Sequence, residues 1–170
     1  MTLRPRATTE RLSAFSDGVF AVLITVLVLE LHPPEAPTFK AVLALWPTWL
    51  SYAVSYVFIA IVWINHHYLM RYASEATHQL LWSNLAHLFS MSLLPLSTAW
   101  MAVSRLAPQP VSFYAAVFFL VNATDISLIR ELIDRTPASP RVRKIMRYRA
   151  IATSRRSAGG SRPDASSLTR

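Results

Sequence analysis

Long apolar stretches separated by short polar segments occupy most of the chain before residue 136. Four of these stretches approach the roughly 20 residues that a helix needs to cross about 30 Å of hydrocarbon. They cover about residues 12–31, 46–69, 80–104 and 111–130. Lipid offers no hydrogen-bond partner to an unpaired backbone group, so each stretch should be helical. The pattern predicts an all-α integral membrane helical bundle with four transmembrane helices.

Prolines mark the ends of these predicted helices. Pro33 follows the first helix, Pro47 opens the second and Pro110 precedes the fourth, positions at which a missing N–H costs little. Pro95 is different because it falls inside the third stretch. There it should kink the helix and free a carbonyl that a nearby hydroxyl can engage.

The composition supports a membrane protein and removes several other classes. Hydrophobic residues make up 53% of the 170 positions and charged residues only 15%, which is too apolar for an ordinary soluble domain. The chain has no cysteine, so it forms neither disulfides nor thiolate metal sites. The formal net charge of +8 is compatible with binding to nucleic acid and with binding to a membrane surface. The positions of the charges along the chain distinguish between these two partners.

The basic residues are distributed as membrane topology requires. If four helices cross the membrane, fifteen of the 17 Lys and Arg residues fall on one side, and only Lys40 and Arg105 lie in the loops on the other. Cytoplasmic segments carry such an excess of positive charge. We therefore expect a multi-pass protein of the cell membrane with both termini in the cytoplasm.

A change of composition divides the chain into a transmembrane domain, residues 1–135, and a cytoplasmic tail, residues 136–170. The tail is basic, has few apolar residues and should be largely disordered. Residues 141–152 could form a basic helix on anionic lipid headgroups. These charges are not accompanied by interleaved aromatic residues or by the pattern of a nucleic-acid-binding domain. Membrane lipid is therefore the expected partner of the tail, and nucleic acid is not.

The first helix has two different faces. At about 100° per residue, one stripe collects Phe15, Gly18, Val22, Val26 and Leu29, with Thr25 on its flank. The other side carries Asp17, Phe20, Ile24, Leu27 and Leu31. In a monomeric bundle both faces would simply be packing surfaces. In a symmetric oligomer the valine stripe could instead converge on an axis, and the residues alone leave both arrangements open.

An acid near the start of this helix needs a partner. A carboxylate inside a membrane-length segment is costly, and such groups are usually paired and often functional. Asp17 points away from the valine stripe, so it should contact neighbouring helices. Asn65 and either His66 or His67, near the end of the second helix, are its natural partners.

Other polar residues within the helices are interpreted as structural. We expect interhelical hydrogen bonds from Asn84, His87, Asn122 and Asp125. The group His66, His67, Glu75 and His78 is close in sequence, but adjacent histidines point about 100° apart on a helix and zinc sites show stronger spacing. No Gly-rich phosphate loop and no pairing of a nucleophile with a base is visible. The sequence therefore predicts no metal, no cofactor and no enzyme.

Three segments carry a resemblance to a known family. Arg11-x-x-x-Phe15-Ser16-Asp17, continuing as Gly18-Val19-Phe20-Ala21-Val22 and Leu27-Val28-Leu29-Glu30, resembles the signature of the bacterial relatives of the lysosomal potassium channel called transmembrane protein 175. Trp63-Ile64-Asn65-His66-His67 is similar to that family's second helix, and Asn84 through Trp100 is similar to its third. One Phe-Ser-Asp would be a weak signal. The three segments follow in order, and the resemblance covers about residues 9–133.

The resemblance implies a potassium-preferring cation channel that assembles as a homotetramer with the first helix lining the pore. Its apolar constriction would consist of Val22, Val26 and Leu29, flanked by Thr25 and Glu30. Because the family commonly has bulkier aliphatic residues there, the two valines imply a wider constriction. The resemblance also implies a network behind the pore helix that joins Arg11, Phe15, Ser16 and Asp17 to Asn65 and His66 or His67.

The composition constrains how such a pore could select ions. Only three glycines occur, Gly18, Gly159 and Gly160, and there is no Thr-Val-Gly-Tyr-Gly loop. A potassium filter built from backbone carbonyls is therefore excluded, and side chains must select. A ring of valine and leucine would gate by dewetting, with cation preference reinforced by Glu30 or Asp17 near the mouths.

The chain departs from the family pattern after its fourth helix. Bacterial members resemble six-helix subunits, whereas a basic tail stands here where the fifth and sixth helices are expected. This departure motivates an alternative function, a truncated or frame-shifted four-helix membrane protein that does not conduct or that serves as an accessory subunit. Potassium flux through the purified chain would separate the two functions.

Overall fold

The computed structural model describes residues 5–73 and 75–135, with side chains described from residue 9 to residue 133. Every regular element in this part of the chain is an α-helix. The elements are α1 (Pro5–Leu29), α2 (Phe39–Ala44), α3 (Trp46–Met70), α4 (His78–Ser92), α5 (Leu94–Val103) and α6 (Pro108–Arg135). The predicted all-α fold is confirmed, whereas the tail predicted for residues 136–170 lies outside the described residues.

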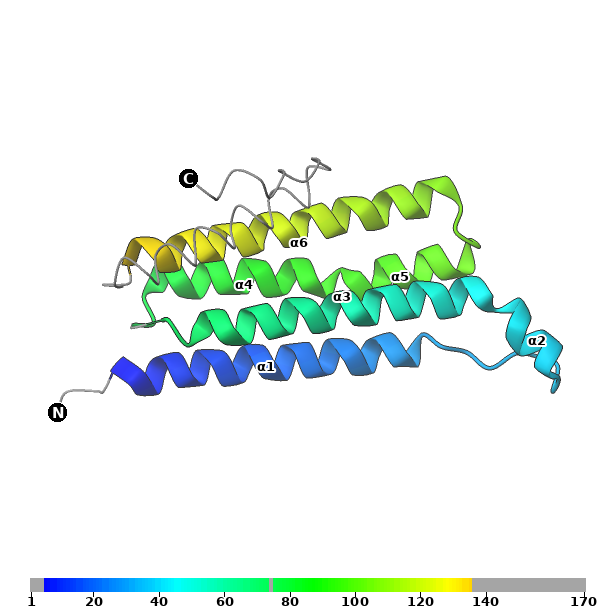
Figure 1. Cartoon of the computed structure of the whole chain (residues 1–170), viewed down its shortest axis with the longest axis horizontal. Coiled ribbons are helices and arrows are strands. Elements are labelled where there is room, and N and C mark those ends of the chain that lie inside the picture. Colours follow the sequence, from blue (N-terminus) through cyan, green and yellow to red (C-terminus); the bar gives the residue numbers. More distant parts are fainter. Residues whose placement is uncertain (1–4, 74, 136–170) are drawn as a thin grey trace, which may run out of the picture.

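Four helical segments are long and apolar enough to cross a membrane. They are Thr9–Leu29, Trp46–Met70, His78–Val103 and Pro108–Ile133, and the third of them joins α4 and α5. Each overlaps its predicted stretch and differs from it by at most three residues at either end. Figure 1 shows the long helices lying side by side, with α2 projecting at one end. The protein is a multi-pass membrane protein.

The third span is divided where its proline occurs. α4 and α5 meet at Leu93, so Pro95 lies in the first turn of α5, where its missing N–H costs little. The hydroxyls of Ser97 and Thr98 donate to the carbonyl of Leu94 at 2.9 and 2.7 Å. The predicted kink is confirmed as a helix break, but the hydroxyls engage the carbonyl of Leu94 and not that of Met91, which is the one that Pro95 frees.

An apolar core joins all four spans. Phe20, Leu23 and Leu27 of α1 are buried in one cluster with Ile59, Val62, Leu88, Met91, Leu94, Val117 and Val121. A second cluster collects Leu12, Leu69, Met70, Leu80, Leu128, Ile129 and Leu132. The buried residues of α1 recur every three or four positions, so one face of this helix is turned into the bundle along its length.

α5 ends in a left-handed turn made by two residues that are not glycine. Arg105 has a φ of 52° and Leu106 a φ of 63°. The Leu106 N–H bonds to the carbonyl of Met101 at 3.0 Å, and the Arg105 N–H to that of Ala102 at 3.1 Å. This is the Schellman pattern of a helix C-terminus, in which glycine usually occupies the position of Arg105. An L side chain crowds the backbone at positive φ, so the arginine is held there against a local steric cost.

α2 is fastened to the start of α3. The Thr38 hydroxyl accepts a hydrogen bond from the N–H of Ala41 at 3.2 Å and so caps α2. The Trp49 indole donates to the carbonyl of Val42 at 3.3 Å. The first bond starts α2, and the second joins α2 to α3.

Candidate functional site: the first helix and its anchors

α1 exposes an apolar stripe on the side away from the core. Val22 is 59% exposed, Val26 36% and Leu29 74%. Phe20 and Leu27, on the opposite side, are each 1% exposed. The rotation of the helix is therefore the one that its sequence predicts. A continuous exposed stripe of aliphatic side chains on a membrane helix faces lipid or another protein surface.

Two polar residues accompany this stripe. Thr25 is exposed, and its hydroxyl donates to the carbonyl of Val22 at 2.7 Å. Glu30 directly follows the last residue of α1 and is exposed. The stripe therefore carries a hydroxyl oxygen along its length and a carboxylate at its end.

Asp17 joins α1 to α3 through an indole. The Trp63 Nε1 donates to the Asp17 Oδ1 at 2.8 Å. The expected partner Asn65 is exposed, and the acid bonds instead to the residue two positions before it. Successive positions on a helix point about 100° apart, so a shift of two residues places the partner on a different face of α3. The acid fastens α1 to a helix of the same subunit.

Asn84 is the centre of a buried polar cluster that joins α1, α3 and α4. Its amide nitrogen donates to the Ser16 hydroxyl at 3.0 Å, and its carbonyl oxygen accepts from the His66 Nε2 at 2.8 Å. The Ser16 hydroxyl donates onward to the carbonyl of Leu12 at 2.9 Å. Ser16, His66 and Asn84 are each fully buried. Two residues of the predicted network, Ser16 and His66, thus meet through a residue of the third span.

A second histidine extends this cluster to α6. The His87 ring stacks on that of His66 with 5.9 Å between centroids and 6° between planes. The His87 Nδ1 lies 3.1 Å from the Thr124 hydroxyl, which lies 2.9 Å from that of Ser90. The interhelical hydrogen bonds predicted for Asn84 and His87 are confirmed. Polar side chains from all four spans form one continuous group.

Several predicted residues lie outside this group. Arg11, Phe15 and Asn65 are exposed, and His67 is half-buried beside Trp63, with 5.8 Å between ring centroids. Asn122 was predicted to bond between helices, but its amide donates to a carbonyl of its own helix, that of Phe118, at 2.7 Å. Among the described residues, no three His, Asp or Glu side chains gather closely enough to hold a metal ion.

One polar contact was not predicted from the sequence. The Ser55 Oγ lies 2.7 Å from the Thr98 Oγ1 and 3.1 Å from the Tyr114 hydroxyl, joining α3, α5 and α6. A signal for it was present, because Ser51 and Ser55 precede His66 on the side of α3 where buried residues recur every three or four positions. Small hydroxyl residues on the buried side of a membrane helix commonly bond between helices.

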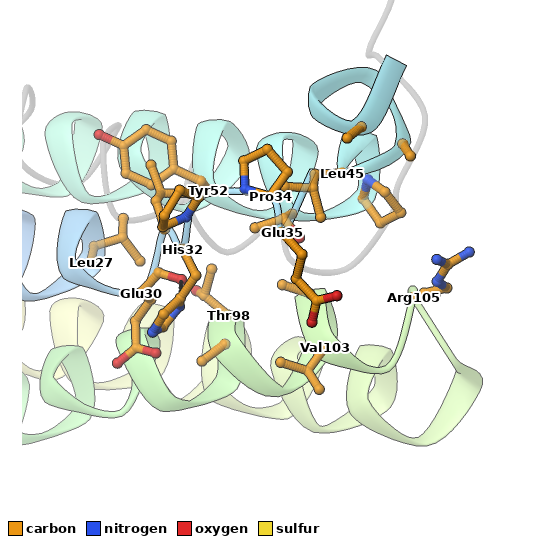
Figure 2. A pocket seen from close by; sticks show the side chains of 18 of the residues that line it. Leu27, Glu30, His32, Pro34, Glu35, Leu45, Tyr52, Thr98, Val103 and Arg105 are labelled. Atoms are coloured by element: carbon orange, nitrogen blue, oxygen red, sulfur yellow. Dashed lines mark hydrogen bonds between the residues drawn. The ribbon is translucent and has the colours of Figure 1, made fainter. Parts of the chain in front are cut away.

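A cavity opens at the end of the bundle that holds α2. Its volume is about 670 Å³, and its walls come from the end of α1, the following loop, α2, the start of α3 and the end of α5 (Figure 2). The walls are largely aliphatic, with the hydroxyls of Tyr52 and Thr98 among them. Glu30, Glu35 and Arg105 supply the charged side chains of the lining.

The segment that carries most of this geometry matches a known family. The model of the family described as endosomal/lysosomal potassium channel TMEM175 matches residues 11–95. This range covers half of the chain and includes Ser16, Asp17, Trp63, His66 and Asn84. The chain belongs to the TMEM175 family. The resemblance seen in the sequence is thereby confirmed.

Curated relatives in the TMEM175 family include bacterial and animal proteins. The chain is 37% identical over 125 residues to a potassium channel of Chryseobacterium, covering 74% of this chain and 65% of that protein. It is 34% identical over 122 residues to a potassium channel of Chamaesiphon minutus, covering 66% and 60%. The match to the human endosomal/lysosomal proton channel TMEM175 is 32% identical over 113 residues, covering 59% and 22%. The chain thus spans less than two thirds of these relatives, whose names denote channels and not enzymes.

A solved TMEM175 structure has the same arrangement of helices. The crystal structure of a lysosomal potassium-selective channel TMEM175 homologue from Chamaesiphon minutus matches with a TM-score of 0.75 and 28% sequence identity. The match covers 89% of this chain and 86% of that chain. The fold described above is therefore one that the TMEM175 family uses.

Proposed function

We propose that this protein is a potassium-preferring cation channel in which α1 helices from several copies line the pore. The observation that carries the proposal is the exposed stripe of Val22, Val26 and Leu29 on a helix whose other face is buried. The polar cluster and the apolar core fix the rotation of α1, so every copy presents the same stripe. Membership of the TMEM175 family and the names of the bacterial relatives support the same function.

The constriction in this proposal is made by side chains. Val22 and Val26 lie one turn apart, so symmetric copies would form rings about 6 Å apart along the pore, since each residue rises about 1.5 Å. Apolar rings of this kind control conduction by dewetting. Glu30 at the end of α1 would gather cations at one mouth and disfavour anions.

The proposed assembly is a homotetramer in the cell membrane with both termini cytoplasmic. The start of α1 and the end of α6 lie at the same end of the bundle (Figure 1), as an even number of spans requires. Of the described basic residues, Arg6, Arg11, Arg71, Arg130 and Arg135 belong to that end, whereas Lys40 and Arg105 belong to the loops at the other. A single copy leaves the stripe of α1 exposed, so a pore needs further copies.

Cysteine substitution tests the pore lining directly because the chain contains no cysteine. Val26→Cys places a thiol on the stripe, and Val111→Cys is a matched control on α6, since the two valines are 36% and 39% exposed. The proteins are reconstituted in liposomes, and potassium flux is measured before and after a water-soluble, charged thiol reagent. We expect flux through Val26→Cys to fall towards the level of empty liposomes, because a charged group would then sit in the constriction. Flux through Val111→Cys should not change.

Two outcomes would overturn parts of this proposal. If the unsubstituted chain gave no more potassium flux than empty liposomes, the channel function would be wrong and the nonconducting four-helix alternative would stand. If it conducted and the reagent affected both cysteine variants equally, conduction would be right but α1 would not line the pore.

A further inference from the structure

We infer that the cavity at the α2 end of the bundle binds one phospholipid whose headgroup carries a primary ammonium, of the phosphatidylethanolamine type. This site shares Glu30 with the end of the α1 stripe, but Val22, Val26 and Leu29 do not line it, and lipid binding does not depend on conduction. Three independent features of the cavity lead to this ligand: its depth in the membrane, the charges in its lining, and the backbone of Arg105.

The ends of the four spans place the cavity at the boundary between hydrocarbon and headgroups. α1 ends at Leu29 and α5 at Val103, while α3 begins at Trp46. The lining extends from Leu27, within a span, to Glu35, in the loop beyond it. Exposed Trp46 on the same end of α3 fits this depth, because tryptophan prefers the membrane interface. A lipid has the same profile as this lining, apolar at one end and charged at the other.

The few charges at this end of the protein are concentrated in the cavity lining. The two loops at this end contain four Asp, Glu, Lys or Arg residues, and three of them, Glu30, Glu35 and Arg105, line the cavity. In Figure 2 the Glu35 carboxylate lies between Glu30 and Arg105 in the view. Carboxylates accept hydrogen bonds from an ammonium, and a guanidinium binds a phosphate with two parallel bonds. An ethanolamine phosphate contains both groups, joined by a two-carbon linker.

The backbone of Arg105 supports a task for its side chain. Arg105 occupies the position of the Schellman turn where glycine is usual, with a φ of 52°. Glycine would remove the steric cost of this conformation, but it would also remove the guanidinium. Residues held in strained backbone conformations cluster at ligand sites. The strained turn places a cation in the lining of a cavity that otherwise carries carboxylates.

The chemistry of the lining distinguishes between lipid headgroups. A quaternary ammonium has no N–H to donate and is bound mainly over aromatic rings, whereas Tyr52 is the one Phe, Tyr or Trp in the lining. An anionic headgroup would meet the two carboxylates of Glu30 and Glu35 against the Arg105 guanidinium and the His32 imidazole, so repulsion from the carboxylates would offset much of the attraction. A primary ammonium with a phosphate matches both signs. The volume of about 670 Å³ is that of a small-ligand site, so it holds the headgroup and the adjoining part of the lipid.

Native mass spectrometry of the full chain in detergent tests the proposal. Phosphatidylethanolamine, phosphatidylcholine and phosphatidylglycerol with identical acyl chains are titrated separately, and the bound copies per subunit are counted. We expect one phosphatidylethanolamine to bind at a lower concentration than either of the other lipids. Arg105→Gly should weaken its binding about tenfold through loss of a charge-assisted contact, while the Tm does not fall because glycine suits the turn. Lys40→Gln, which removes the other basic residue of this end from outside the lining, should leave binding unchanged.

A second pair of variants tests the volume of the cavity without changing its charged side chains. Ala102→Phe narrows the cavity and should reduce phosphatidylethanolamine binding, whereas Ala123→Phe, at an exposed position on α6, should not. Equal binding of the three lipids, stronger binding of phosphatidylglycerol, or equal effects of Arg105→Gly and Lys40→Gln would each overturn the proposal. If Ala102→Phe dissociated the oligomer and left lipid binding intact, the cavity would be a contact site for another subunit, and the proposal would be wrong.

Discussion

The two halves of α1 are held in the bundle by different combinations of forces. In the first half, Ser16 and Asp17 make hydrogen bonds to Asn84 and Trp63, in addition to the apolar packing of Leu12. In the second half, Phe20, Leu23 and Leu27 are held by apolar packing, and the helix then ends beside an open cavity. Hydrogen bonds are directional, whereas apolar contacts are not. The first half therefore adds a directional constraint on the rotation of α1 to the constraint that packing imposes along the whole helix.

This division has a consequence for the proposed pore. The stripe of Val22, Val26 and Leu29 lies in the half held by packing alone, and the hydrogen bonds of the other half help to set its direction. Lipid is as apolar as a leucine side chain, so packing in a membrane depends on close fit and not on exclusion of water. Substitutions that remove packing should therefore lower the stability of the protein. Substitutions that remove the hydrogen bonds should in addition change the direction of the stripe.

The largest effect is expected from a substitution in the packed half. Phe20→Ala leaves a cavity where a side chain that is 1% exposed contacts the core, and should lower the free energy of unfolding by about 3 kcal/mol. Val22→Ala is the control, because that side chain is exposed and should cost less than about 0.5 kcal/mol. Unfolding of the purified protein in mixed detergent micelles measures both. Equal losses would show that Val22 is also packed, which would contradict the two faces of α1.

A smaller effect is expected at the centre of the polar cluster. Asn84→Ala leaves buried Ser16 and His66 without their shared partner and should cost about 2 kcal/mol. Because the cluster constrains rotation, this variant should also change the rate at which a thiol in Val26→Cys reacts with a water-soluble reagent. Asn65→Ala is the matched control at an exposed asparagine and should leave stability and reactivity unchanged. If the thiol reacted at the same rate in Asn84→Ala, the polar cluster would not determine the rotation of α1.

The smallest effect is expected for the acid. Asp17→Ala and Trp63→Phe each remove one end of the 2.8 Å bond, and a double-mutant cycle should give a coupling free energy of about 1 kcal/mol. In liposomes, Asp17→Ala should lower the yield of oligomer more than it alters the ratio of potassium to sodium flux, since the acid bonds to α3 and not along the stripe. Strictly additive stability losses would argue against this bond.

The local features of the fold could be predicted from the sequence. The spans follow from apolar length, the break at Leu93 from Pro95, and the two faces of α1 from its period of about 100° per residue. Ser16 and His66 were predicted to share a network that includes Asn65, and in the structure both bond to Asn84 instead. The spans, the break and the two faces could be predicted because each depends on a single helix.

Features that depend on two helices at once could not be predicted in the same way. The bond from Trp63 to Asp17, where Asn65 was expected, is set by the axial offset between α1 and α3, which no pattern within one helix reports. The contact of Ser55 with Thr98 depends in addition on the break that turns α5. The cavity combines side chains from four helices and two loops, so Arg105 and Glu35 were not recognised as neighbours of one site.

The hydrogen bond of Thr25 determines what its oxygen presents to the outside of α1. A threonine hydroxyl has one proton and two lone pairs, and here the proton is directed to the Val22 carbonyl at 2.7 Å. The lone pairs are what remain for any species that approaches the exposed side of this residue. In the proposed pore, a cation at that level would meet an acceptor oxygen, and an anion would find no hydrogen to bind. One bond inside the helix would thus give an uncharged stripe a preference for cations over anions.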